Sequence, residues 1–267
     1  MSIKMKIVRY KKDNKIKNGI LKGEHIYNIQ GDIFSEFSPA EKTDLLKDVE
    51  LLAPINPPNI IAIGLNYRQH AVETGAEIPE RPVIFLKATN SLTDPNSDII
   101  LPKIAADEVD FEAELAVIIS KKAKNIETVE VDDYILGYSC ANDVSARDCQ
   151  IKIDKQWARG KSFDTFCPLG PWIETDLDPA DLKIKSILNG EIMQQSRTSD
   201  MIFNVKQIVS YLSHNMTLLP GTVILTGTPE GVGFARKDPI FLKEGDQIVI
   251  EIEDIGSLEN EVSKEKV

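Results

Sequence analysis

The chain has 267 residues, 42% of them hydrophobic and 6% aromatic, which is enough to bury one large core or one large and one small core. Its 42 acidic side chains outnumber the 31 basic ones, and the net charge is −11. This balance argues against nucleic acid or an anionic membrane as the main partner and favours a small molecule.

No segment has the length and apolar character of a signal-peptide core or a membrane span, so we expect a soluble, cytoplasmic protein. The three cysteines, Cys140, Cys149 and Cys167, show no Cys-x-x-Cys spacing, and no histidine is placed to complete a zinc site. They favour reduced, buried thiols over a catalytic cysteine.

Residues 1–52 are predicted to form a small N-terminal β/α domain. Turn signals at Asp13-Asn14 and Gly23-Glu24 separate three short runs that predict a meander of strands. A helical stretch is predicted around residues 41–51, and the proline-rich segment 54–58 follows as a linker. The predicted strands cover residues 3–10, 15–22 and 25–29.

Residues 53–267 are predicted to form one large domain in which strands outnumber helices. The helices are short and irregularly interleaved, which disfavours a doubly wound parallel sheet and favours a mixed, β-rich α+β fold. The predicted strands cover residues 59–64, 83–87, 112–120, 134–141, 223–226 and 248–252. The predicted helical segments are 66–75, 142–153 and one that Asn204 caps, in which Val205, Ile208, Val209 and Leu212 recur at helical spacing.

Glu112 and Glu114 stand two residues apart at the start of a run that is apolar on both faces. Side chains alternate along a strand, so both carboxylates point to the same side, which Ala116 and Ile118 mark as buried. Two buried carboxylates that face each other are costly unless a proton or a cation neutralises them. This pair therefore predicts a metal ion.

A second Glu-x-Glu pair, Glu251 and Glu253, provides a comparison within the same chain. There Ile248, Ile250 and Ile252 form one face of the strand, and the glutamates lie on the other. This alternation predicts a half-exposed strand with a solvated acidic edge. Spacing alone is weak evidence, and the buried continuation distinguishes the first pair.

Asp143 lies where a predicted strand passes into a predicted helix. A carboxylate at such a position is most often a helix N-cap. Joined to Glu112 and Glu114, it would instead complete a site of three carboxylates. Oxygen-only ligands favour Mg²⁺, Mn²⁺ or Ca²⁺ over zinc, and retained waters would leave positions open for a substrate.

His70 and Glu73 are three residues apart, so on a helix they share a face and can act as a base and the group that orients it. A surface ion pair is the alternative for this pair. Lys161 sits between a glycine and an aromatic-rich stretch, where solvated lysines are less usual, and its alternative is an ion pair at a strand edge.

The loop Thr226-Gly227-Thr228-Pro229-Glu230-Gly231-Val232-Gly233 follows a short predicted strand and can present backbone N–H groups to an anion. It is not a phosphate loop, because no Gly-Lys-Ser/Thr follows, and it lacks the Gly-x-Gly-x-x-Gly of dinucleotide-binding folds.

These stretches together resemble the fumarylacetoacetate hydrolase family, and the similarity extends from about Ala53 to the C-terminus. It rests on five ordered blocks: Gly64-Leu65-Asn66-Tyr67-x-x-His70, Asp110-Phe111-Glu112-x-Glu114-Leu115-Ala116-Val117, Asn142-Asp143-Val144-Ser145-Ala146-Arg147-Asp148, Gly160-Lys161-Ser162-Phe163-Asp164 and Thr226-Gly227-Thr228-Pro229-x-Gly231-Val232-Gly233.

The resemblance implies a β-roll catalytic domain that is usually a homodimer, with Mg²⁺ or Mn²⁺ held at the positions of Glu112, Glu114 and Asp143. It also implies a histidine and a glutamate on a lid, a lysine that contacts the substrate, and further substrate contacts. The catalytic positions are His70, Glu73 and Lys161, and the substrate-binding positions are Arg147, Gln150, Thr226 and Gly227.

The reactions of this family include C–C bond hydrolysis, decarboxylation, and tautomerisation or isomerisation of 2-oxo acids, and fold-level kinship cannot choose among them. We expect a Mg²⁺- or Mn²⁺-dependent hydrolase of an acylpyruvate or fumarylpyruvate. The alternative is an oxaloacetate tautomerase, a decarboxylase or a 2-oxo acid isomerase, since residues 155–171 look closest to the branch that includes oxaloacetate tautomerases.

A metabolite-binding or scaffold protein that kept the fold is a hypothesis of a different class. The presence of His70, Glu73 and Lys161 beside the three carboxylates argues against it, because a binding module would not need a base.

Overall fold

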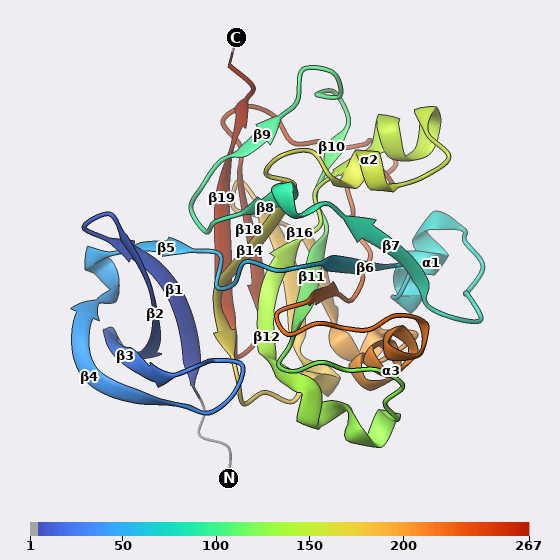
Figure 1. Ribbon diagram of the computed structural model, residues 1–267. Coiled ribbons are helices and arrows are strands. Elements are labelled where there is room, and N and C mark those ends of the chain that lie inside the picture. The colour runs from blue at the N-terminus through green and yellow to red at the C-terminus, as the bar shows by residue number, and fades with distance from the viewer. Residues whose placement is uncertain (1–4, 267) are drawn as a thin grey trace.

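Strands dominate the structure, and most of them join one long mixed sheet that runs through both parts of the molecule (Figure 1). The computed structural model describes residues 5–266, so the start of the strand predicted from Ile3 lies outside the described residues. The predicted β-rich α+β fold is confirmed, with antiparallel and parallel pairs in the same sheet.

From residue 5 onward, where the description begins, the small N-terminal domain is built from five strands. Asp13 and Asn14 take φ values of 48° and 60°, as a type I′ turn between two antiparallel strands requires. The strands are β1 (Lys6–Lys12), β2 (Lys15–Lys22), β3 (His25–Gly31), β4 (Phe37–Leu45) and β5 (Glu50–Leu52).

The helix predicted around residues 41–51 is wrong. β4 pairs with β3 as far as Leu45, a 3-10 turn covers Leu46–Asp48, and β5 pairs with β1. The backbone groups of this stretch are satisfied by strands distant in the sequence, which a local pattern does not reveal. The small domain is therefore β rather than β/α.

The central strands of the large domain continue the same sheet, because β1 also pairs with the strand β14 through Lys6 and Ile7. Every residue of the strand that follows Glu112 is buried, as predicted for a strand apolar on both faces. These strands are β6 (Ile60–Gly64), β7 (Val83–Lys87), β8 (Leu92–Thr93), β11 (Ala113–Ile119), β12 (Ile135–Asn142), β14 (Cys167–Glu174) and β17 (Val223–Leu225).

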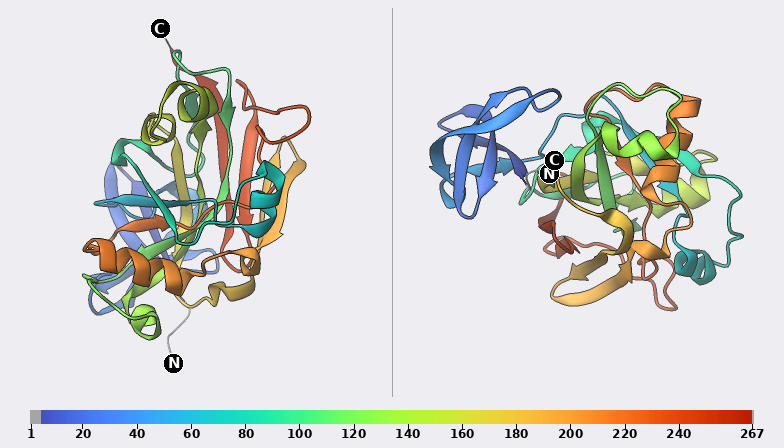
Figure 2. Two further views of the ribbon diagram at one scale, coloured as in Figure 1. Left: turned by 90° about the vertical axis from the view of Figure 1, so that its right-hand side faces the viewer. Right: turned by 90° about the horizontal axis from the view of Figure 1, so that it is seen from below.

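The order along the main sheet is β4-β3-β2-β1-β14-β12-β11-β17-β6-β7. The small domain therefore lies at one end of the sheet and β7 at the other, and Figure 2 shows the small domain standing out on one flank of the larger body.

A second sheet packs beside the first. In its strand β18, Ile248, Ile250 and Ile252 are buried while Glu251 is half-exposed beside Lys185, which confirms the predicted alternation. The strands in order are β16 (Glu191–Arg197), β15 (Lys183–Leu188), β18 (Gln247–Ile252), β19 (Gly256–Lys264) and β9 (Ile99–Leu101), and a separate short pair joins β10 (Val109–Asp110) to β13 (Ser145–Ala146).

The described residues form three α-helices, all of them short: α1 (Arg68–Thr74), α2 (Ala158–Lys161) and α3 (Val205–Asn215). The predicted cap of α3 is confirmed, since the Asn204 side chain accepts a hydrogen bond from the Gln207 backbone N–H. None of the described helices has the length and apolar character needed to cross a membrane.

The helix predicted over residues 142–153 is wrong in its first half. Asn142 ends β12, and Ser145 pairs with Asp110 in the β10–β13 ladder. Only Asp148–Ile153 forms a wide helical turn. Asp143 is therefore not the N-cap of a helix, and its carboxylate is free for other contacts.

Candidate active site

Glu112, Glu114 and Asp143 come together at one end of the central strands of the large domain. Each offers a carboxylate oxygen within 4.8 Å of the others, and all three residues are buried. Glu114 lies on β11 and Glu112 just before it, while Asp143 follows β12, the antiparallel neighbour of β11. The Asp143 backbone N–H donates to the Glu112 carbonyl at 2.9 Å, which fixes the two segments against each other.

Lys161 is buried within this group of acids. Its Nζ lies 2.8 Å from Glu112 Oε2 and 2.7 Å from Asp143 Oδ2. Burial favours the neutral amine, but the two carboxylates outweigh it and raise the pKa of Lys161. The ammonium is thus held at the centre of the site as a charged donor.

Asp143 is held between two lysines. Its second oxygen, Oδ1, lies 2.5 Å from Nζ of Lys87, the last residue of β7, which also donates to the Val144 carbonyl at 3.3 Å. Both side chains of this second pair have 0% exposure. Each oxygen of Asp143 therefore has its own ammonium.

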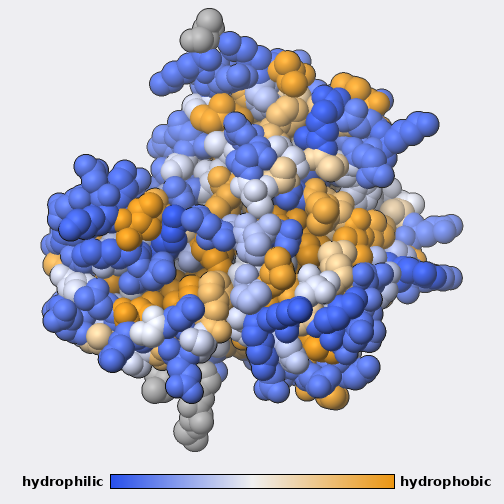
Figure 3. Space-filling view, in the orientation of Figure 1, coloured by the Kyte–Doolittle hydropathy of each residue, from blue (hydrophilic) through white to orange (hydrophobic). Residues whose placement is uncertain are grey.

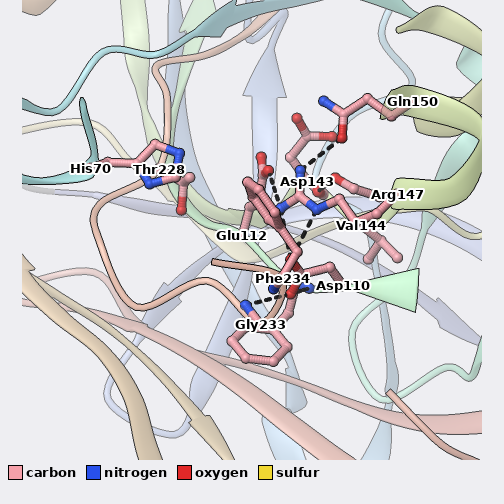
Figure 4. A network of polar contacts seen from close by, with 12 residues as sticks. His70, Asp110, Glu112, Asp143, Val144, Arg147, Gln150, Thr228, Gly233 and Phe234 are labelled. Atoms are coloured by element: carbon pink, nitrogen blue, oxygen red, sulfur yellow. Dashed lines mark hydrogen bonds and ion pairs between the residues drawn. The ribbon is translucent and has the colours of Figure 1, made fainter. Parts of the chain in front are cut away.

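Arg147 connects the site to a further buried carboxylate. Its guanidinium lies 2.7 Å from Glu112 and 2.8 Å from Asp110, and it donates to the Gln150 side-chain oxygen at 2.8 Å. It also lies over the Phe234 ring, 4.3 Å from the ring centre. Figure 4 shows this network, with Arg147 between Glu112, Asp110 and Gln150.

Glu112 and Glu114 differ in their electrostatic surroundings. Burial opposes ionisation of Glu112, but Lys161 and Arg147 hold its pKa well below the usual range. Burial, followed by repulsion from Asp143 and Glu112, raises the pKa of Glu114 well above the usual range. The hydrogen bond from the Gly227 backbone N–H at 2.7 Å does not offset these effects.

This donor set fits a divalent metal. Among the described residues of the site, four buried carboxylates lie with three buried cations, so the acids outnumber the cations by one. Burial, together with repulsion from the neighbouring acids, raises the pKa of Glu114. A hard cation with oxygen ligands would remove that excess. Glu112, Glu114 and Asp143 are the residues that could hold it.

His70 and Glu73 form the predicted hydrogen-bonded pair on α1. His70 Nδ1 lies 2.9 Å from Glu73 Oε2, and the other Glu73 oxygen accepts a hydrogen bond from the Gly231 backbone N–H at 2.8 Å. If Nδ1 donates its proton to Glu73, Nε2 keeps its lone pair. The His70 side chain is only 10% exposed, so the pair differs from a solvated surface ion pair.

A cavity of about 220 Å³ joins these groups. His70, Glu112, Glu114 and Lys161 all line it, and so do several apolar side chains. Figure 4 shows His70 beside Thr228, on the opposite side of the site from Gln150. The further lining residues are Ile63, Gly64, Leu65, Thr74, Ala76, Phe85, Arg147, Gln150, Ile151, Trp157, Thr228 and Phe234.

Thr226 and Gly227, the other two predicted substrate contacts, do not line this cavity. The Thr226 hydroxyl donates to the Leu115 carbonyl at 2.8 Å, and the Gly227 N–H donates to Glu114. The loop therefore presents N–H groups to anions as predicted, but here the anions are side chains of the protein itself. A direct contact of Thr226 or Gly227 with a substrate stays a prediction.

Several residues of the site were not predicted as site residues, and three of them hold or cover its buried charges: Lys87, Asp110 and Phe234. Asp110 is fully buried, and it accepts hydrogen bonds from the backbone N–H groups of Gly233 and Phe234 as well as from Arg147. The sequence does carry one signal for Lys87, which ends the apolar run of residues 83–87. A charged side chain next to such a run is often paired with a buried acid rather than solvated.

Two family models match this chain and together cover most of it. The model described as Fumarylacetoacetate (FAA) hydrolase C-terminal matches residues 59–263, and the model described as Rv2993c-like, N-terminal matches residues 5–54. The chain belongs to the fumarylacetoacetate hydrolase family. Members of this family with solved structures share the fold over nearly the whole chain.

One similar protein is the oxaloacetate tautomerase Fahd2a, mitochondrial, of Rattus norvegicus, which is 47% identical over 218 residues, or 80% of this chain and 69% of that protein. The structure of a 2-hydroxyhepta-2,4-diene-1,7-dioate isomerase from Mycobacterium marinum matches with a TM-score of 0.88 and 41% identity, covering 98% of this chain and all of that one. A fumarylacetoacetate hydrolase from Exiguobacterium antarcticum matches with a TM-score of 0.90 and 36% identity over 98% of this chain and 100% of its own.

Lys87→Met should destabilise this family member strongly, because it leaves the buried Asp143 with one ammonium instead of two. Loss of one partner of a buried ion pair typically costs about 3–5 kcal/mol. Urea unfolding without added metal measures the free energy of unfolding. Lys185→Met is the matched control, because Lys185 is also paired with an acid, Glu251 at 2.9 Å, but its side chain is 29% exposed. This substitution should lower the free energy of unfolding by at most about 1 kcal/mol. Equal stability of the two variants would contradict the role given to Lys87.

Proposed function

We propose that this protein is a metal-dependent enzyme that interconverts the keto and enol forms of a short 2-oxo acid, with oxaloacetate as the leading substrate. The observation that carries the proposal is that a histidine oriented by a glutamate shares one small cavity with a buried lysine and with Glu112 and Glu114, two of the three clustered carboxylates. The tautomerase name of the rat relative supports the same reaction class.

The chain's own residues account for the proton transfer. His70 removes a proton from the carbon beside the keto group, and Glu73 stabilises the imidazolium that results. The ammonium of Lys161 stabilises the negative charge that develops on the keto oxygen. A proton from solvent on that oxygen, and release of the His70 proton to solvent, complete the enol, so no other reactant is consumed.

A divalent cation held by Glu112, Glu114 and Asp143 would polarise the 2-oxo group and offset the carboxylate charge of the substrate. Two cationic side chains of the chain itself, Arg147 and Lys161, also line the cavity and would attract an anionic substrate. The small volume suits a short acid, because drug-sized ligands occupy cavities of about 300–1,000 Å³.

Hydrolysis of a C–C bond in an acylpyruvate is the second candidate function. It is supported by the hydrolase name of the Exiguobacterium antarcticum structure and by the same base, because His70 could activate a water instead of a carbon acid. A proton-NMR screen of the Mg²⁺-loaded protein with oxaloacetate, acetylpyruvate and fumarylpyruvate separates the two. Faster keto–enol exchange of oxaloacetate without cleavage products supports the tautomerase, and cleavage products support the hydrolase.

Glu114→Gln should weaken Mg²⁺ or Mn²⁺ binding by at least about tenfold, because it removes a charged ligand from an oxygen-only site. Isothermal titration calorimetry measures the affinity. Glu251→Gln changes the same residue type on the outer face of β18 and should leave the affinity unchanged. Wild-type affinity in the Glu114 variant would remove this carboxylate from the metal site.

His70→Ala should lower the rate of oxaloacetate tautomerisation by about 10²–10⁴-fold while leaving Mg²⁺ affinity nearly unchanged, since loss of a general base costs a factor of this size. The enol absorbance of oxaloacetate follows the rate. His25→Ala, in the small domain, is the matched control and should retain the wild-type rate. A wild-type rate in the His70 variant would exclude this histidine as the base.

We also propose that the chain forms a homodimer through the large domain. Apolar side chains stay exposed near the edge strand β7 and the turn before α2, with Leu86 53%, Ile151 54% and Ile153 63% exposed. Figure 3 shows apolar groups gathered over this part of the surface, which is otherwise largely hydrophilic.

Light scattering at micromolar concentration should give twice the 29.8 kDa of one chain, and a mass of one chain would refute the dimer.

A further inference from the structure

Trp157 closes one side of the cavity and takes no part in the charge network. It lies immediately before α2, the short helix that ends with Lys161, and the Lys161 backbone N–H donates to its carbonyl at 3.2 Å. The indole ring meets the Phe85 ring edge-on, with 5.5 Å between ring centres. Both rings line the cavity.

The contacts place Trp157 beyond the polar end of the cavity. Lys161 Nζ lies 5.3 Å from the centre of the Phe85 ring, so Phe85 lies close to both the carboxylate-bound ammonium and Trp157. From Glu112 and Lys161 through Phe85 to Trp157, the cavity wall therefore changes from charged to aromatic. A 2-oxo carboxylate group belongs at the charged end, and whatever extends from it meets the aromatic end.

Gly64 provides the space in which the indole ring sits. A Cβ atom at Gly64 would lie 2.5 Å from Trp157 Cζ3 and 3.0 Å from Cη2. Gly64 is not among the glycines with positive φ, so its backbone would accept an alanine and the only conflict is with the ring. Gly64 ends β6 and pairs with Val83 of β7, so the ring has to move rather than the paired strand.

We propose that Trp157, seated against Gly64, limits the length of the acyl group that the cavity accepts beyond the 2-oxo carboxylate. The inference rests on the proposed function, since it takes the ligand to be a 2-oxo acid. It restricts the substrate class to short acids whose distal carbon atoms end before the Phe85–Trp157 wall. Extended or aromatic acyl groups would fit only if the indole ring moved away from Gly64.

The test compares the binding of a short and a long ligand in a form that does not turn them over. Acetylpyruvate and benzoylpyruvate share the 2-oxo acid end and differ only in the distal group. Calorimetry on the Mg²⁺-loaded His70→Ala protein gives both affinities without proton transfer. The same background carries Trp157→Ala, Gly64→Ala and both together, and Trp172→Phe is the control because Trp172 lies outside the cavity.

Trp157→Ala should raise the affinity for benzoylpyruvate relative to acetylpyruvate by at least about tenfold, the order of discrimination that a cavity wall provides. Gly64→Ala should shift the ratio in the same direction, because its Cβ displaces the ring, and it should have no further effect when Trp157 is already alanine. Trp172→Phe should leave the ratio unchanged.

A ratio within twofold of the parent in Trp157→Ala would overturn the size limit while leaving the proposed function in place. An effect of Gly64→Ala that persists in the double variant would contradict the role given to Gly64, since it would show that this glycine affects ligand binding without the Trp157 ring. Failure of every variant, including the parent, to bind either ligand would overturn the proposed function and the size limit together.

Discussion

The pairing of buried charges at the end of the central strands constrains the rest of this structure. Taking a carboxylate or an ammonium out of water costs several kcal/mol, and the cost is recovered only where opposite charges are held in good geometry. Asp143 meets this condition through Lys161, from α2, and Lys87, from β7 at the far edge of the sheet. A shift of either element would take one of the two ammonium groups away from the buried Asp143. The position of β7 beside β6 and the short α2 are therefore requirements of the site as much as features of the fold.

The loop after β17 links the charged site to the base. Three of its backbone N–H groups point to three different acids: Gly227 donates to Glu114, Gly231 to Glu73 and Gly233 to Asp110. The glycines are needed because the backbone comes so close, and a Cβ at Gly233 would lie 1.9 Å from the Ile240 carbonyl oxygen. One loop thus holds Glu114, Asp110 and the orienting Glu73 at fixed positions relative to each other, which is what pre-organised proton transfer needs.

The part of the site that the sequence could predict is the part encoded by local spacing. Glu112 and Glu114 follow from alternation along one strand, and His70 with its glutamate follows from one helical turn. Lys87 and Asp110 could not be found in this way, because their partners lie 56 and 37 residues away and only the packed sheet brings them together. The helix wrongly predicted in the small domain has the same cause: its residues are held by strand pairs of long sequence separation, and these override local preference.

The choice between tautomerisation and hydrolysis depends on space more than on the catalytic groups. Both reactions can use His70, Lys161 and a cation at the three carboxylates, so these residues do not separate them. Hydrolysis needs a water beside the distal carbonyl, and one water takes about 30 Å³ of the volume that the ligand leaves free. In a cavity of about 220 Å³, a longer acyl group would fill the volume on the side of Phe85 and Trp157. The proposed Trp157 wall would keep the long acylpyruvates out, and this is the physical reason for which we propose proton transfer on a compact 2-oxo acid rather than their hydrolysis.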